Sequence, residues 1–246
     1  MTALPLPASS PPLALDVIGL KKSYGDVVAV NGLDLRVAPG EIYGLLGPNG
    51  AGKTTTINLF LGFLSPDGGC AVIDGVDVAA DPVGARRKLA YIPEQVALYP
   101  RFTGVENLEY FSALGGRSHT PNELYELLER AGLPRAAADR RVGTYSKGMR
   151  QKVGVALALA TGAKVLLLDE PTSGLDPAAS HDFSQLLRRL AKEQVAILMA
   201  THDLFRARED ATRVGILIGG KLAAEYSRRE LEKADLEKLY LERLRA

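Results

Sequence analysis

Eight consecutive residues, Gly47 to Thr54, have the types and spacing of a phosphate-binding loop. They match the pattern G-x-x-x-x-G-K-[ST]. The glycines allow backbone N–H groups to curl around phosphate oxygens without a side-chain clash. Lys53 would add a positive charge beside the outer phosphates, and the hydroxyl of Thr54 is a ligand for Mg²⁺. The alternative is a glycine-rich turn that binds nothing, and the motifs described next argue against it.

The segments around this loop are those that a phosphate site needs. Residues 41–46 are predicted to form a buried strand, and residues 54–61 a helix. Phosphate would then lie at a helix N-terminus, where free N–H groups and the helix dipole favour an anion. The predicted binding residues are Gly47, Pro48, Asn49, Gly50, Ala51, Gly52, Lys53, Thr54 and Thr55.

Two adjacent carboxylates, Asp169 and Glu170, follow a buried apolar run at residues 165–168. In open α/β sheets, ligands bind at the carboxyl ends of strands. Asp169 is therefore predicted to hold Mg²⁺, and Glu170 to accept a proton from the water that attacks a terminal phosphate. Alone, two acids at a strand end would be ordinary surface residues. Their combination with a phosphate-binding loop favours the catalytic interpretation.

A third motif is the sequence Tyr-Ser-Lys-Gly-Met-Arg-Gln-Lys at residues 145–152. Ser146 is a suitable N-cap for a helix that continues through Val153 and Leu157. One interpretation is a capped helix and nothing more. The other is a second anion site, built from backbone N–H groups, a hydroxyl and the helix dipole.

The composition is that of an ordinary soluble globular protein. Of 246 residues, 46% are hydrophobic and 24% are charged, and the net charge of +1 gives no reason to expect a nucleic-acid partner. The single Cys70 cannot form an internal disulfide, which fits a reducing, cytosolic setting, and we predict that it is buried in a strand. We see no secretory signal or membrane-spanning segment, and we predict a flexible tail at residues 1–12.

Apolar runs alternate with helical patterns along the chain, which predicts an α/β fold with a parallel sheet. Shorter runs before Glu41 and around Cys70 indicate a smaller antiparallel part as well. The predicted strands are residues 13–20, 42–46, 71–73, 89–92, 165–168, 195–200 and 214–218.

Two segments are predicted to be helical. Residues 96–160 have little strand signal, and Thr120, Pro121 and Glu123 form the capping box of a helix start, so this segment is predicted as a helical insertion. Residues 227–246 are predicted as one amphipathic helix that packs on the domain. Its apolar face would comprise Leu236, Leu239, Tyr240 and Leu244.

In this order, the three motifs resemble those of the nucleotide-binding subunits of ATP-binding cassette (ABC) transporters. The resemblance covers residues 13–226. It implies a P-loop NTPase (RecA-like) core with an antiparallel β subdomain and an inserted α-helical subdomain. It also implies that two subunits enclose two ATP molecules, each between the phosphate-binding loop of one subunit and the Ser-x-Gly signature of the other.

The resemblance assigns roles to further residues. Tyr24 matches the aromatic residue that stacks on adenine, and Gln95 matches the glutamine that touches Mg²⁺ and the attacking water. His202 matches the histidine that contacts the γ-phosphate. Asp176 matches a loop that crosses the dimer interface, and because Pro177 follows it, Asp176 is also a good N-cap.

The signature of this chain departs from the family's commonest form, Leu-Ser-Gly-Gly-Gln. Gly148 is kept, Lys147 replaces a glycine, and Met149 replaces the glutamine. Ser-Lys-Gly-Met signatures resemble those of ABC exporters with separately encoded permeases. The resemblance implies that Ser146, Lys147 and Gly148 bind the nucleotide held by the partner subunit.

We therefore predict an ATP-hydrolysing subunit, with ATP and Mg²⁺ as cofactors, that powers export through a separate membrane permease. It would act as a homodimer on the cytoplasmic face of the membrane, without nucleic acid. The alternative is a soluble ABC ATPase acting in repair or translation, but such relatives usually have two cassettes or a long coiled coil. A third interpretation is a GTPase or a small-molecule kinase. This chain lacks the Asn-Lys-x-Asp motif that binds guanine, and that interpretation leaves Glu170, the signature and His202 unexplained.

Overall fold

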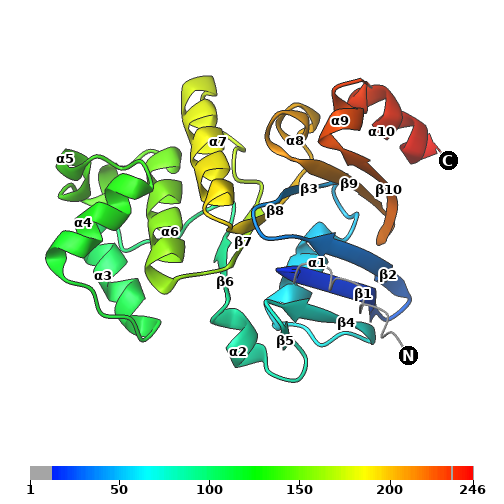
Figure 1. The fold of residues 1–246 in the computed structure, drawn as a ribbon, viewed down its shortest axis with the longest axis horizontal. Coiled ribbons are helices and arrows are strands. Elements are labelled where there is room, and N and C mark those ends of the chain that lie inside the picture. Colours follow the sequence, from blue (N-terminus) through cyan, green and yellow to red (C-terminus); the bar gives the residue numbers. More distant parts are fainter. Residues whose placement is uncertain (1–12, 234, 246) are drawn as a thin grey trace, which may run out of the picture.

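The computed structural model describes residues 13–233 and 235–245, which form two β-sheets and the helices around them (Figure 1). The predicted tail at residues 1–12 lies outside the described residues. No helix in the described ranges is both long enough and apolar enough to cross a membrane.

The larger sheet has six strands in the order β10-β9-β3-β8-β7-β6. Neighbours from β9 to β6 run parallel, and β10 pairs antiparallel with β9. Every residue of β3 is buried, because both faces of the sheet are covered. All five strands predicted here exist, with ends shifted by at most one residue. The bounds are β3 Ile42–Leu46, β6 Leu89–Ile92, β7 Val165–Asp169, β8 Ala196–Thr201, β9 Arg213–Ile218 and β10 Lys221–Ser227.

The smaller sheet is antiparallel, with the strand order β2-β1-β4-β5, as the sequence indicated. It comprises β1 (Leu15–Tyr24), β2 (Val27–Val37), β4 (Gly68–Ile73) and β5 (Val76–Asp77). Strand β1 continues four residues beyond its predicted end because β2 pairs with it as far as Tyr24. The predicted burial of Cys70 is wrong in degree, since this residue is half-buried. Burial alternates along β4, and its neighbour Ala71 faces the core instead.

A group of helices lies beyond β6, drawn in green on the left of Figure 1. Helix α6 packs against α3, α4 and β6, so it joins this group to the larger sheet. Thr120 caps α4 with the predicted capping box: its side chain accepts from the N–H of Glu123, whose carboxylate accepts from the N–H of Thr120. The group comprises α3 Gly104–Leu114, α4 Pro121–Arg130, α5 Arg135–Ala138, the 3₁₀ turn η1 Val142–Thr144 and α6 Lys147–Thr161.

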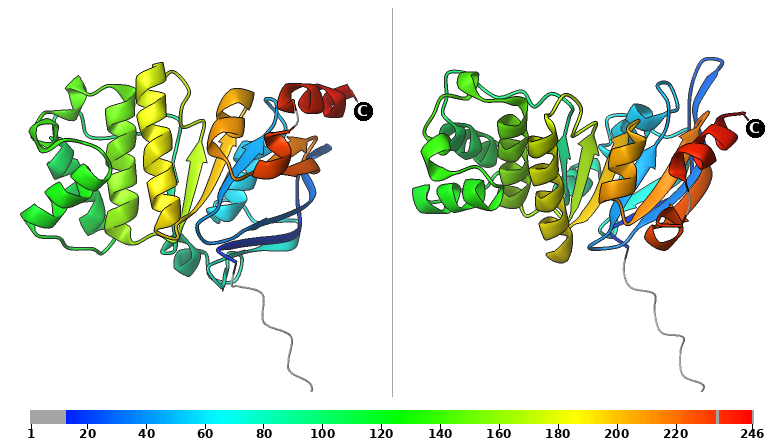
Figure 2. Two further views of the ribbon diagram at one scale, coloured as in Figure 1. Left: turned by 45° about the horizontal axis from the view of Figure 1, so that its top comes forward. Right: turned by 90° about the horizontal axis from the view of Figure 1, so that it is seen from above.

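The larger sheet separates two hydrophobic clusters. Successive side chains of β3 enter opposite ones, because they point to opposite faces. Ile42 and Leu46 pack in the cluster that includes α6 and α7 (Pro177–Lys192). Tyr43 and Leu45 pack in the other, with α1 (Lys53–Phe60) and the smaller sheet. In both views of Figure 2 the blue and cyan strands of this smaller sheet lie toward the right, away from the green helices at the left. The remaining helices are α2 Pro82–Arg86, α8 Leu204–Asp210, α9 Arg228–Leu231 and α10 Leu236–Arg245.

The C-terminal segment corrects the prediction of one helix over residues 227–246. Two helices are present, and the carboxylate of Asp235 explains the second start, because it accepts from the N–H groups of Glu237 and Lys238 at 3.0 and 3.3 Å. Leu236 and Tyr240 are buried as expected. The apolar face ends earlier than predicted, since Leu244 is 41% exposed.

Thr120→Ala is expected to destabilise the protein by about 1 kcal/mol, because α4 loses its N-cap. The midpoint of thermal unfolding should fall by about 2–4 °C. Thr120→Ser keeps a hydroxyl at the cap and is the matched control. Equal midpoints for the alanine and serine variants would show that this cap contributes nothing.

Candidate functional site

Four neighbouring parallel strands end at one edge of the larger sheet. Leu46 pairs with Thr201, Asp169 with Ala200, and Ile92 with Leu168, so the ends of β3, β8, β7 and β6 are nearly level. The predicted phosphate-binding loop follows β3, Asp169 and Glu170 end β7, His202 follows β8, and Gln95 follows β6. The sheet therefore gathers these residues at the edge where ligands bind in such folds.

The loop between β3 and α1 is closed by its own lysine. The ammonium of Lys53 donates to the carbonyl oxygens of Gly47 at 2.5 Å and Pro48 at 3.1 Å, and the residue is only 7% exposed. Burial lowers the pKa of Lys53, whereas the nearby charges of Glu170 and Asp169 raise it. An anion bound in the loop would stabilise the charged form of this buried ammonium.

The loop backbone adopts a conformation that requires glycine at two positions. Gly50 and Gly52 have φ angles of 80° and 106°, which other residues rarely adopt. A side-chain carbon on Gly52 would also collide with the carbonyl oxygen of Ala29. Gly52 is the N-cap residue of α1 and has no side chain with which to cap the first turn. The first N–H groups of α1 are thus available to phosphate oxygens.

Asp169 lies beside this loop at the end of β7 and is half-buried. Burial, followed by the charge of Glu170, raises the pKa of Asp169, and Lys53 opposes that shift. Burial, followed by the charge of Asp169, raises the pKa of Tyr91 on β6 to about 12. In both cases burial is the larger cause and a neighbouring carboxylate adds to it. Two carboxylates so close together are a suitable environment for a divalent cation with oxygen ligands.

Glu170 is held by both of its carboxylate oxygens. Oε2 accepts from the hydroxyl of Thr201 at 3.0 Å, and Oε1 lies 2.7 Å from Nδ1 of His202. The backbone of Glu170 is left-handed, with φ 45°, and its N–H donates to the carbonyl of Ala200 at 2.9 Å. A strained backbone of this kind is typical of residues held in place for function. The carboxylate is 16% exposed and the imidazole 59%.

Several predicted residues are accessible, and among the residues that the structure describes no side-chain hydrogen bond joins them to this centre. Gln95 and Thr54 are exposed, and Thr55 is half-buried. Within the described part of the chain, no hydrogen bond involves the side chain of Gln95. Tyr24 lies at the end of β1 in the smaller sheet and is 49% exposed.

The signature segment lies apart from the phosphate-binding loop. Ser146 caps α6 by accepting from the N–H of Met149 at 3.3 Å, so the predicted cap is confirmed. Asp176 likewise caps α7 by accepting from the N–H of Ala179 at 2.8 Å. Gly148 is buried against this second segment, where a side-chain carbon would lie 3.7 Å from Ala179. Among the described residues, no hydrogen bond or ion pair joins Ser146, Lys147 or Gly148 to residues 47–52.

The structure adds polar residues that the sequence analysis did not single out. Glu94 contacts both Lys147 and Ser173, and its place directly before Gln95 at a strand end was an available signal. Thr201 precedes His202 and binds Glu170. Gln151 is fully buried and donates to the carbonyl oxygen of Pro171. A polar residue on the buried face of a predicted apolar helix was the signal for Gln151.

Comparison with known proteins agrees with this geometry. A model of the ABC transporter family matches residues 30–173. The daunorubicin/doxorubicin resistance ATP-binding protein DrrA of Streptomyces peucetius is 37% identical over 228 residues, which cover 92% of this chain and 69% of the relative. The Nod factor export ATP-binding protein I of Rhizobium sp. (strain N33) is 40% identical over 217 residues, with 87% and 71% covered.

Solved structures give the same result. The structure of an ATP-binding subunit of an ABC transporter superposes with a TM-score of 0.81 at 32% identity, over 94% of this chain and 99% of that one. The dimeric, post-hydrolysis state of the ATP-binding cassette MJ0796, bound to ADP and Pi, gives a TM-score of 0.77 at 27% identity, with 87% and 99% covered. The chain therefore belongs to the ABC transporter family, as an ATP-binding subunit whose hydrolysis of ATP is coupled to transport.

Proposed function

We propose that this chain works as half of a head-to-tail pair that powers export through a separately encoded membrane permease. The observation that carries the proposal is the convergence of three groups at one sheet edge: the loop closed by Lys53, the carboxylate of Asp169, and Glu170 paired with His202 at 2.7 Å. The relatives named for drug resistance and for Nod factor export support export as the direction.

In the proposed site, residues 47–55 bind the phosphates of ATP and Tyr24 stacks on adenine. Thr54, Gln95 and Asp169 would hold Mg²⁺, because they supply oxygen ligands and because Asp169 is half-buried close to the carboxylate of Glu170. When bound, Mg²⁺ neutralises charge on the outer phosphates. Lys53 adds a second positive charge from inside the loop.

Glu170 is proposed as the general base. Its hydrogen bonds with Thr201 and His202 fix both carboxylate oxygens, so the carboxylate can accept a proton from water without reorienting. The exposed imidazole of His202 would contact the γ-phosphate through the ring edge that faces solvent. The two residues would thus hold the water and the phosphate from neighbouring strand ends.

The second half of each site is proposed to come from the partner. Ser146 is exposed, and its helix N-terminus lies away from the loop of its own chain. A partner arranged head to tail would place Ser146, Lys147 and Gly148 on the other chain's ATP, with Asp176 near the contact. The dimeric MJ0796 cassette bound to ADP and Pi supports a pair of this kind.

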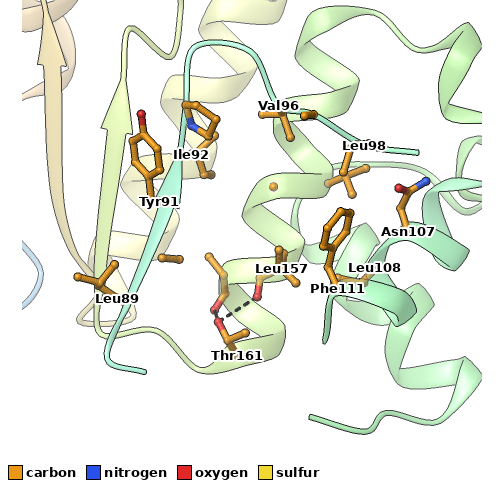
Figure 3. A pocket seen from close by; sticks show the side chains of 16 residues that line it. Leu89, Tyr91, Ile92, Val96, Leu98, Asn107, Leu108, Phe111, Leu157 and Thr161 are labelled. Atoms are coloured by element: carbon orange, nitrogen blue, oxygen red, sulfur yellow. Dashed lines mark hydrogen bonds between the residues drawn. The ribbon is translucent and has the colours of Figure 1, made fainter. Parts of the chain in front are cut away.

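An apolar groove of about 340 Å³ is the proposed contact with the permease. It runs between β6, α3 and α6, and Val96, Leu98, Phe111 and Leu157 point into it in Figure 3. Exposed aromatic rings of Tyr99, Phe102 and Tyr110 pack together beside it. Unpaired apolar surface next to a hollow is typical of protein interfaces. An apolar segment of the permease would dock there and hold this subunit on the cytoplasmic face of the membrane.

Replacing Glu170 tests the general base. Glu170→Gln should bind ATP normally and hydrolyse it about 10²–10⁴-fold more slowly, since the amide cannot accept the proton. Glu126→Gln, on the exposed face of α4, is the control. The measurement is single-turnover hydrolysis together with the equilibrium binding of ATP. Turnover near the wild-type rate would refute this role for Glu170.

Removing the loop lysine tests the phosphate site. Lys53→Ala should weaken ATP binding at least about tenfold, because a buried charge-assisted contact with phosphate is lost. Binding of a fluorescent ATP analogue and circular dichroism would be measured on the same samples. Lys233→Ala removes the same charge from an exposed position. Unchanged affinity in a folded Lys53→Ala protein would contradict the proposed site.

A charge at the rim of the groove tests the permease contact. Ala97 lines the groove and is exposed, so Ala97→Glu should fold normally and still hydrolyse ATP. A tagged Ala97→Glu chain should no longer retain a multi-helix membrane protein when purified from detergent-solubilised native membranes. Ile18→Glu, on the exposed side of β1, is the control. If the wild-type chain retains only soluble partners or nucleic acid in this purification, the result would favour the non-transport alternative.

A further inference from the structure

One carboxylate oxygen joins three segments near the start of α6, the helix that begins within the signature. Oε1 of Glu94 accepts from the hydroxyl of Ser173 at 3.0 Å and from the ammonium of Lys147 at 3.4 Å. Glu94 lies in the loop after β6, Lys147 is the first residue of α6, and Ser173 lies in the loop after Glu170. Glu94 therefore connects the segment of Gln95 to the signature and to the segment that follows the general base.

The electrostatics of α6 explain why an acid is needed here. The N-terminus of a helix has partial positive charge, so a cation in the first turn is unfavourable. The first turn of α6 contains Lys147 and no acidic residue, and Arg150 follows. Glu94 supplies the missing negative charge from another segment. Without it, this end of α6 would be strongly attractive to any anion.

We propose that Glu94 is a positioning residue that holds the ammonium of Lys147 within its own chain until the nucleotide bound to the partner chain takes its place. The proposal rests on the head-to-tail pairing proposed above. Lys147 then has two alternative partners: the carboxylate of Glu94 in the free chain, and phosphate in the closed pair. Glu94 thereby opposes closure until ATP is present.

The structure favours an exchange of partners over a permanent bridge. The side chains of Lys147 and Glu94 are 28% and 47% exposed, so water screens their attraction and the pair is weak. A nucleotide carries several negative charges where Glu94 carries one, and contacts with phosphate are among the strong charge-assisted ones. Lysine suits the exchange because its charge lies at the end of a flexible stem.

Release of Lys147 would also reach the neighbouring segments. The buried amide of Gln151 donates to the carbonyl of Pro171, so α6 and the loop after Glu170 are held together independently of Glu94. Breaking the ion pair leaves the carboxylate of Glu94 with the hydroxyl of Ser173 as its remaining hydrogen-bond partner, and Glu94 directly precedes Gln95. Binding of a nucleotide at the partner's site would thus change the contacts of Glu94, which lies next to residues of this chain's own site.

The experiment measures ATP-dependent pairing in a Glu170→Gln background by analytical ultracentrifugation. Adding Glu94→Gln should tighten the pair about two- to fivefold, the range expected for losing one exposed ion pair. Adding Lys147→Gln should weaken it, and adding both should give the value of Lys147→Gln alone. Glu109→Gln, exposed on α3, is the charge-matched control. An unchanged dissociation constant for Glu94→Gln, or equal tightening with and without Lys147, would overturn the proposal.

A second measurement does not require two chains to pair. In the nucleotide-free chain, labelling of Lys147 by an amine-reactive ester, followed by mass spectrometry, should rise about two- to fivefold in Glu94→Gln. Lys233 on the same molecules is the internal reference. If the Glu170→Gln chain binds ATP but stays monomeric, the head-to-tail function fails. In that case, increased labelling of Lys147 would still establish that Glu94 holds this amine, and unchanged labelling would refute it.

Discussion

The hydrogen-bonded register of four parallel strands determines where the phosphate-binding loop, the two carboxylates and His202 lie. Strands β3, β8, β7 and β6 end nearly level, so residues separated by more than 100 positions in the chain meet at one edge. Packing fixes that register, because a slip by one residue would move each side chain of a strand such as β3 into the hydrophobic cluster on the opposite face. The loops at this edge can therefore vary in sequence while the positions from which they start stay fixed.

Charge at this edge is balanced only in part. Lys53 is buried against two carboxylates, and burial shifts the pKa of Lys53 down and that of Asp169 up. Both shifts disfavour charge separation in the free chain, whereas a ligand that combines phosphate with a divalent cation would compensate both groups at once. The proposed ligand, ATP with Mg²⁺, has both signs of charge and would compensate Lys53 and Asp169 together.

Much of this arrangement could be predicted from local sequence. The loop at residues 47–54, five of the six strands of the larger sheet and the caps at Thr120, Ser146 and Asp176 depend on neighbours within a few positions, and the structure contains them. The sixth strand, β10, was not predicted. Other features depend on partners far along the chain. The contact of Glu94 with Lys147 spans 53 positions and is specified by no local pattern. The prediction of one helix over residues 227–246 failed at Asp235. An apolar stripe in the sequence does not show that a side chain within it caps the start of a second helix.

The division of the core by the larger sheet has a consequence for how the protein opens. Helix α1, which follows the phosphate-binding loop, packs in one cluster, whereas α4 and α6 pack in the other. Contacts within a cluster break together, and contacts in different clusters need not. The helical group and the loop can therefore form separate cooperative units, with different amide exchange rates. If the permease docks in the groove as proposed, local opening of α3 and α4 would absorb strain from it while the phosphate-binding loop stays folded.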